Sequence, residues 1–235
     1  MQERYIRNIG FITKQEQYKL LNQSVAIIGL GGQGGYIADG LARLGIKRLV
    51  VFDPDKFEES NLNRQLYCNK DTIGLFKAEQ TANELKKVNP DLIVDYYCFA
   101  FGIDSIDLVK NCNFIFACCD STHNPEENRE ALKICMKHGI PVMDVAVTEF
   151  GCQLYCDIDN FEAWDEFSKN YCQTTTEDAH KVGQPAFLCA LAANLGVSEM
   201  VRYFTYPYPK SIMRAVIIYD LYKNEIFRFP LVEEE

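Results

Sequence analysis

The chain has 235 residues, 48% of them hydrophobic, which is enough to bury one substantial core. Its formal net charge is −9 and it holds no large cluster of lysine and arginine, which argues against a nucleic-acid-binding protein. No apolar run approaches the roughly 20 residues that a membrane-spanning helix needs, so no membrane association is predicted.

The ten cysteines favour a reducing compartment. The first residues are not followed by the apolar run of a signal peptide, and several cysteines, such as Cys118 and Cys119, lie in apolar strand-like runs. We therefore expect a cytoplasmic protein whose cysteines are mostly reduced core residues. No two cysteines have C-x-x-C spacing, so no zinc site is predicted.

From residue 24 onward, short apolar runs alternate with amphipathic stretches. The apolar runs predict strands at 24–29, 48–53, 92–99, 113–118 and 141–147. The helical spacing of apolar residues predicts helices at 32–44, 76–88, 104–111 and 124–138. This strand–helix alternation predicts an α/β, Rossmann-like fold with a mostly parallel central sheet and helices on both faces.

The last third of the chain has a different pattern. It predicts a strand, a short helix, a polar loop and a long apolar helix, at 152–158, 161–170, 169–183 and 186–204. Residues 212–219 and 225–229 are predicted to pair as a hairpin around Lys223 and Asn224. We therefore expect a terminal antiparallel extension of the sheet, with all 235 residues in a single domain.

Five glycines lie within the seven residues that follow the first predicted strand, at 29–35. Gly29, Gly31 and Gly34 match the G-x-G-x-x-G pattern, which allows a tight turn, close approach to phosphate and helix packing. The helix after the turn offers free N–H groups to a phosphate. Asp53 ends the second strand, where a carboxylate accepts hydrogen bonds from ribose hydroxyls. The sequence thus predicts a nucleotide site.

The residues after the second strand favour ATP over a nicotinamide cofactor. Arg64 follows Asn61, and Lys77 lies at the start of a predicted helix. Arginine binds phosphate oxygens in a fork and lysine supplies a mobile point charge. Such cations stabilise charge that moves onto a leaving pyrophosphate. An NAD-dependent oxidoreductase would account for the glycines and Asp53 but would give Arg64 and Lys77 no function.

Several motifs then occur in a fixed order between residues 4 and 150. They are Arg4-Tyr5-Ile6-Arg7, the glycine turn, Asp53-x-Asp55, Ser60-Asn61-Leu62-Asn63-Arg64-Gln65, Ile73-Gly74-x-x-Lys77-Ala78, Asn89-Pro90 and Cys119-Asp120. In this order the chain resembles the ThiF/MoeB/HesA family, which is similar to the adenylating half of ubiquitin-activating enzymes. Because it lacks the C-x-x-C pairs of many members, it resembles a zinc-free branch.

The resemblance implies an adenylyltransferase that uses ATP and Mg²⁺ and forms a dimer, either a homodimer or a heterodimer. Its substrate would be the C-terminal carboxylate of a ubiquitin-like or sulfur-carrier protein that ends in glycine. Residues 1–22 would then form an N-terminal arm, 24–150 the nucleotide-binding half, and 151–235 the carrier-binding and dimerisation half. A carboxylate is already ionised at neutral pH, so no protein nucleophile is needed.

The resemblance also assigns roles to individual residues. The phosphate turn would be formed by Gly29, Gly31, Gly32 and Gly34. The other nucleotide-binding residues would be Asp53, Asp55, Asn61 and Gln65. Charge on the phosphates would be stabilised by Arg64 and Lys77, and Mg²⁺ would be held by Asp120. Arg7 resembles the arginine that such proteins insert into the site of the partner subunit.

Some relatives transfer the activated carboxylate to a cysteine, as a thioester or persulfide. Cys172 lies in a polar segment, which is typical of a reactive thiol, whereas Cys152, Cys156 and Cys189 are predicted to be packing residues. Other functions remain open at this point. They are adenylation of a peptide or small carboxylate, a non-catalytic partner subunit that lends Arg7, and an NAD-dependent oxidoreductase.

Overall fold

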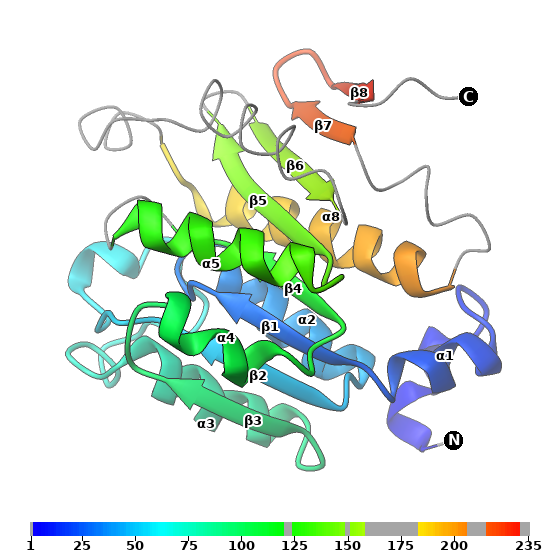
Figure 1. The fold of residues 1–235 in the computed structure, drawn as a ribbon, viewed down its shortest axis with the longest axis horizontal. Helices are drawn as coiled ribbons and strands as arrows, with labels where there is room; N and C mark the ends of the chain where they lie inside the picture. The colour runs from blue at the N-terminus through cyan, green and yellow to red at the C-terminus, as the bar shows by residue number, and fades with distance from the viewer. Residues whose placement is uncertain (1, 120–123, 149–150, 158–182, 206–214, 231–235) are drawn as a thin grey trace.

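The computed structural model describes residues 2–119, 124–148, 151–157, 183–205 and 215–230. These residues build one eight-stranded sheet in the order β3-β2-β1-β4-β5-β6-β7-β8 (Figure 1). The strands are β1 (Ser24–Ile28), β2 (Arg48–Phe52), β3 (Ile93–Tyr97), β4 (Phe114–Ala117), β5 (Val142–Thr148), β6 (Gly151–Asp157), β7 (Ala215–Asp220) and β8 (Glu225–Pro230). β1 to β5 are parallel and β6 to β8 extend the sheet in antiparallel fashion, which confirms the predicted fold class.

Helices cover both faces of the sheet. The helices are α1 (Lys14–Leu20), α2 (Gly34–Leu44), α3 (Lys77–Val88), α4 (Ile106–Val109), α5 (Pro125–Lys137) and α8 (Ala186–Thr205). Short 3-10 turns lie at η1 (Glu3–Asn8), η2 (Glu59–Asn61) and η3 (Ile103–Ser105). Figure 1 shows α4 and α5 in front of the sheet and α2 and α8 behind it. No helix among the described residues is both long and apolar enough to cross a membrane.

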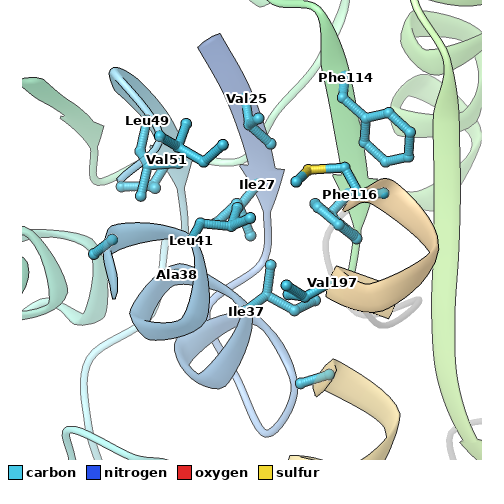
Figure 2. Packing of buried hydrophobic residues seen from close by; sticks show 14 of the residues in the cluster. Val25, Ile27, Ile37, Ala38, Leu41, Leu49, Val51, Phe114, Phe116 and Val197 are labelled. Carbon is cyan, nitrogen blue, oxygen red and sulfur yellow. The ribbon is translucent and has the colours of Figure 1, made fainter. Parts of the chain in front are cut away.

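The central strands are buried on both faces, which is why they read as continuous apolar runs. Val25 and Ile27 of β1 pack in the cluster that also contains residues of α2, α3 and α8. Ala26 and Ile28 point to the other cluster, under α4 and α5. Figure 2 shows the first cluster, where Ile37 and Leu41 of α2 lie against the strands and Val197 of α8 completes the layer.

The order of the strands places the glycine turn at a switch point of the sheet. From β1 the chain proceeds to β2 and β3 on one side, and β4 then lies on the other side of β1. In such sheets, ligands bind outside the carboxyl ends of the strands at this reversal. The ends of β1 and β4 are joined there, because the Cys118 N–H donates to the Ile28 carbonyl oxygen at 2.8 Å.

Among the described residues, the predicted elements agree with the structure apart from their ends. The helix predicted at 104–111 is present, but it begins as the 3-10 turn η3 and continues as the four residues of α4. The helix predicted from residue 32 begins two residues later, at Gly34, because Gly31 and Gly32 belong to the turn. The short helix predicted at 161–170 lies outside the described residues.

We predict that Leu41→Ala lowers the free energy of unfolding by about 3 kcal/mol, because Leu41 is fully buried between α2 and the strands. Urea unfolding followed by circular dichroism measures this change. Leu221→Ala, in the turn between β7 and β8, is the matched control, since Leu221 is 41% exposed. Equal losses in the two variants would contradict the assigned core.

Candidate functional site

The glycine turn is packed so tightly against β4 that two of its positions accept only glycine. Gly29 has a φ of +92°, and a Cβ there would lie 2.7 Å from the carbonyl oxygen of Cys118. A Cβ at Gly34 would overlap the carbonyl oxygen of Gly29. α2 therefore begins close to the end of β1. Gln33 at its N-cap makes no side-chain capping bond, which leaves N–H groups of the first turn for an anion.

Gly31 differs from these two glycines, because the fold has room for a side chain there. The atom nearest to a Cβ at Gly31 would be Nε2 of Gln65, at an ordinary contact distance of 3.8 Å. Neither steric exclusion nor a positive φ requires glycine at this position. The space over Gly31 fits a ligand that approaches the backbone, as phosphate does in the G-x-G-x-x-G turn.

Asp53 ties the glycine turn to the end of β2. It is 4% exposed, and its Oδ2 accepts a hydrogen bond from the Leu30 N–H at 2.7 Å. Its Oδ1 accepts from the Asp55 N–H at 2.8 Å. Burial raises the pKa of Asp53, while the Lys77 charge and these two N–H donors oppose the rise. Each carboxylate oxygen keeps a further lone pair for a ribose hydroxyl.

Lys77 is a buried cation at the start of α3. Its Nζ lies 2.9 Å from Oδ2 of Asp55, and its side chain is 8% exposed against 42% for Asp55. Its backbone N–H also donates to the Asp55 carbonyl oxygen at 2.9 Å. A cation at a helix N-terminus opposes the helix dipole, so this lysine needs an anionic partner. Here Asp55 is that partner. The backbone N–H of Asp55 donates to Asp53, which also accepts a hydrogen bond from the glycine turn.

Arg64 is held near the glycine turn by oxygen atoms of three residues. Its Nε donates to Oε1 of Gln184 at 3.1 Å. Its Nη1 donates to the Ser60 carbonyl oxygen at 2.8 Å and to Oδ1 of Asn63 at 2.9 Å. The Arg64 charge also counteracts the rise that burial causes in the pKa of Cys189, whose Sγ would lie 2.8 Å from a Cβ at Gly32. Arg64 therefore points toward the glycine turn and not into bulk solvent.

Two buried amides complete the predicted phosphate segment. Gln65 is 6% exposed, and its Oε1 is buried without a hydrogen-bond partner in the protein. An orphaned acceptor next to Gly31 is consistent with a ligand that supplies a donor. The side chain of Asn61 instead makes hydrogen bonds within its own turn. Its Oδ1 accepts from the Glu58 N–H at 3.1 Å and its Nδ2 donates to Oγ of Ser60 at 3.3 Å.

With this geometry established, comparison with known proteins assigns the family. The sequence profile described as "ThiF family" matches residues 5–235. The chain belongs to the ThiF family. This membership confirms the resemblance inferred from the motifs.

Relatives and solved structures agree with the family. Ubiquitin-like modifier-activating enzyme 5 of Bombyx mori is 35% identical over 111 residues, which are 47% of this chain and 27% of that protein. Adenylyltransferase and sulfurtransferase UBA4 of Candida albicans is 32% identical over 111 residues, 47% of this chain and 25% of that protein. The matches thus span about a quarter of each relative's length.

The fold is shared with two solved structures. Escherichia coli MccB with ATP superposes with a TM-score of 0.79 at 19% identity, covering 100% of this chain and 73% of MccB. PaaA gives a TM-score of 0.75 at 21% identity, covering 93% of this chain and 67% of PaaA. At this level of identity, the two structures support the fold alone.

Three predicted ThiF residues are not brought to the turn by the described structure. Asp120 and Cys172 lie outside the described residues. Arg7 is exposed in the last turn of η1. The neighbouring Tyr5 packs where a Cβ at Gly45 would be, and Gly45 caps the end of α2 opposite the glycine turn. Arg7 is therefore distant from the site of its own chain.

The sequence analysis missed two residues near the site. Gln184, just before α8, binds Arg64 from far along the chain, and no local pattern marks such a contact. Asp144 stands in the apolar strand β5, next to Ala117 of β4. Burial raises the pKa of Asp144 to about 7, and the charge of Arg129 opposes the rise. A lone acid within an apolar strand is the signal that would have identified Asp144.

We predict that Gly31→Ala and Gly34→Ala separate binding from folding. Gly31→Ala retains the melting temperature but weakens ATP binding at least tenfold, because its methyl group occupies the space for phosphate. Gly34→Ala lowers the melting temperature, because its Cβ overlaps the Gly29 carbonyl oxygen. Calorimetric titration with ATP and thermal melts measure both effects. A stable Gly31→Ala variant with unchanged ATP affinity would contradict this site.

We also predict a pH dependence that comes from Asp144. With a folded pKa near 7 against an ordinary value of 3.8, the folded protein holds this proton more tightly than the unfolded chain. The resulting stabilisation is complete below about pH 4 and is lost as the pH rises through 7. Asp144→Asn should therefore gain stability relative to the wild type between pH 5 and pH 8.

Urea unfolding at several pH values tests this expectation. Asp104→Asn is the control, because Asp104 is an exposed carboxylate outside the site. A stability difference between Asp144→Asn and the wild type that stays constant from pH 5 to pH 8 would refute the assignment of a raised pKa to Asp144.

Proposed function

We propose that this chain carries out ATP-dependent adenylation of the C-terminal carboxylate of a ubiquitin-like or sulfur-carrier protein, with release of pyrophosphate. The main support is that two cations, Lys77 and Arg64, are linked through Asp55 and Gln184 to a glycine turn at the switch point of the sheet. A triphosphate needs such charges and a nicotinamide cofactor does not. A non-catalytic partner subunit is less favoured, because a site that no longer catalyses the reaction has no need for a buried lysine.

The described residues have distinct parts in the proposed reaction. A carboxylate oxygen of the carrier forms a bond to the α-phosphorus, and the bond from that phosphorus to the pyrophosphate oxygen breaks. The N–H groups at the start of α2 bind phosphate, and Asp53 accepts a hydrogen bond from the ribose. Lys77 and Arg64 stabilise the negative charge that collects on pyrophosphate. Catalysis is then positioning and electrostatics.

We also propose that Mg²⁺ binds at the same edge of the sheet. We propose Asp120 as its ligand, since Asp120 directly follows Cys118 and Cys119, and Cys118 lies against Gly29. A carboxylate is the side chain that Mg²⁺ prefers. When bound, the ion would neutralise phosphate charge beside Lys77 and Arg64.

The proposed substrate rests on the relatives. Two of them are named for activating ubiquitin-like modifiers and for adenylyl and sulfur transfer. MccB has been solved with ATP and with MccA. These names favour a protein or peptide terminus over a small carboxylate. They also make a step at Cys172 after adenylation a reasonable extension of the proposal.

We also propose a cytoplasmic homodimer in which Arg7 completes the site of the partner subunit. Arg7 is exposed, and its neighbour Tyr5 packs against Gly45 at the end of α2 opposite the glycine turn, which supports a role for Arg7 outside the site of its own chain. Eight cysteines of the described residues are free thiols, in keeping with a reducing compartment.

ATP–pyrophosphate exchange with purified carrier proteins ending in Gly-Gly tests the proposed function. The wild type should exchange only when a cognate carrier is present. Lys77→Ala should lose roughly 100-fold or more of this activity, the order seen when a charge-stabilising donor is removed. Lys87→Ala, which removes an exposed lysine paired with Glu84 on the same helix, should retain full exchange.

Three results would count against the proposal. Exchange in Lys77→Ala equal to that of Lys87→Ala would remove Lys77 from the chemistry. Binding of NAD without binding of ATP would favour an oxidoreductase instead. ATP binding without exchange for any carrier in the panel would favour a non-catalytic subunit.

A further inference from the structure

Gln184 reaches the nucleotide site from the second half of the chain. It lies two residues before α8 and 120 positions after Arg64. Its side-chain Oε1 accepts a hydrogen bond from Nε of Arg64 at 3.1 Å. Its main-chain oxygen accepts a second bond, from Nδ2 of Asn63 at 3.3 Å. Gln184 thus holds two consecutive residues of the segment that follows η2.

The same side chain lies over the glycine turn. A Cβ built at Gly32 would be 3.7 Å from Oε1 of Gln184 and 2.8 Å from Sγ of Cys189. Cys189 is fully buried in the first turn of α8, so it fixes the start of that helix against the turn. Arg64, Gln184 and Gly32 therefore meet at one point, although they come from three separate parts of the sequence.

The chemistry of this contact suits an arginine that must bind phosphate. Gln184 occupies Nε, and the Ser60 and Asn63 oxygens occupy Nη1. Among the described residues these contacts leave Nη2 available to a phosphate oxygen. All three acceptors are neutral, so they orient the planar guanidinium without cancelling its charge. Lys77 is different, because the carboxylate of Asp55 neutralises it.

We propose that Gln184 is a positioning residue for the adenylation reaction. It fixes the guanidinium plane of Arg64 over the glycine turn, and so raises the affinity for the triphosphate without itself touching the reacting atoms. This inference rests on the proposed function. It adds that the orientation of Arg64, the arginine proposed to bind phosphate, depends on how α8 packs against the turn. This helix belongs to the second half of the chain.

A double-mutant cycle on ATP binding tests the proposal, with ATP as the titrant in calorimetry. Gln184→Ala should weaken binding about tenfold, the order expected for one hydrogen bond to a charged group. Arg64→Ala should weaken it at least as much. The double variant should bind ATP no more weakly than Arg64→Ala alone, because Gln184 acts only through Arg64.

Gln184→Met separates hydrogen bonding from packing. Methionine keeps the length of the side chain over Gly32 and Cys189 but lacks the amide oxygen, so its ATP affinity should fall as in Gln184→Ala. Asn194→Ala is the control, since it removes an exposed amide of α8 that bonds only within its own helix. Melting temperatures should stay unchanged in Gln184→Met and Asn194→Ala.

The outcomes distinguish this inference from the proposed function. If the wild type binds ATP but the losses of Gln184→Ala and Arg64→Ala add in the double variant, the positioning role is wrong and the proposed function stands. Wild-type affinity in Gln184→Met would likewise overturn it. If the wild type binds no ATP, both proposals are overturned.

Discussion

The site depends on one buried carboxylate. Asp53 accepts the Leu30 N–H of the glycine turn with one oxygen and the Asp55 N–H with the other. The first bond fixes the turn relative to β2, and the second fixes the residue that binds Lys77. A buried carboxylate costs free energy unless donors surround it, and here backbone donors and a nearby cation supply that compensation. Asp53 thus supports both the glycine turn and Lys77, the residues that we propose to bind phosphate and to stabilise its charge.

The two cations of the site are held in opposite ways. Lys77 is almost completely buried, so the structure neutralises it with Asp55, and a triphosphate must compete with that carboxylate. Arg64 is more exposed and is held by neutral oxygens, so its charge is undiminished before any ligand arrives. Arg64 is suited to attracting the nucleotide, whereas Lys77 is suited to interacting at short range once water has been displaced.

The sequence predicted those features that depend on local pattern. Apolar runs such as 24–29 are buried on both faces, so they identify parallel strands without knowledge of the fold. Arg64 and Lys77 lie far from the turn along the chain, and they were identified by the motifs that contain them. The contact of Gln184 depends on how α8 packs, and that of Asp144 on the order of the strands in the sheet. Both are features of the tertiary structure, so no local sequence pattern predicts them. The 3-10 turn at η3 was missed because its side-chain spacing resembles that of a helix.

The glycine pattern combines two requirements that the sequence alone cannot separate. Gly29 and Gly34 are required by the close packing of α2, β1 and β4, whatever the turn binds. A chain without a ligand would need them equally, so their presence supports the fold more than the function. Gly31 has room for a side chain and still carries none. Its neighbour Gln65 keeps a buried oxygen without a partner. Gly31 therefore supports a nucleotide at this turn more than Gly29 and Gly34 do, because the protein leaves open the space that a phosphate would need.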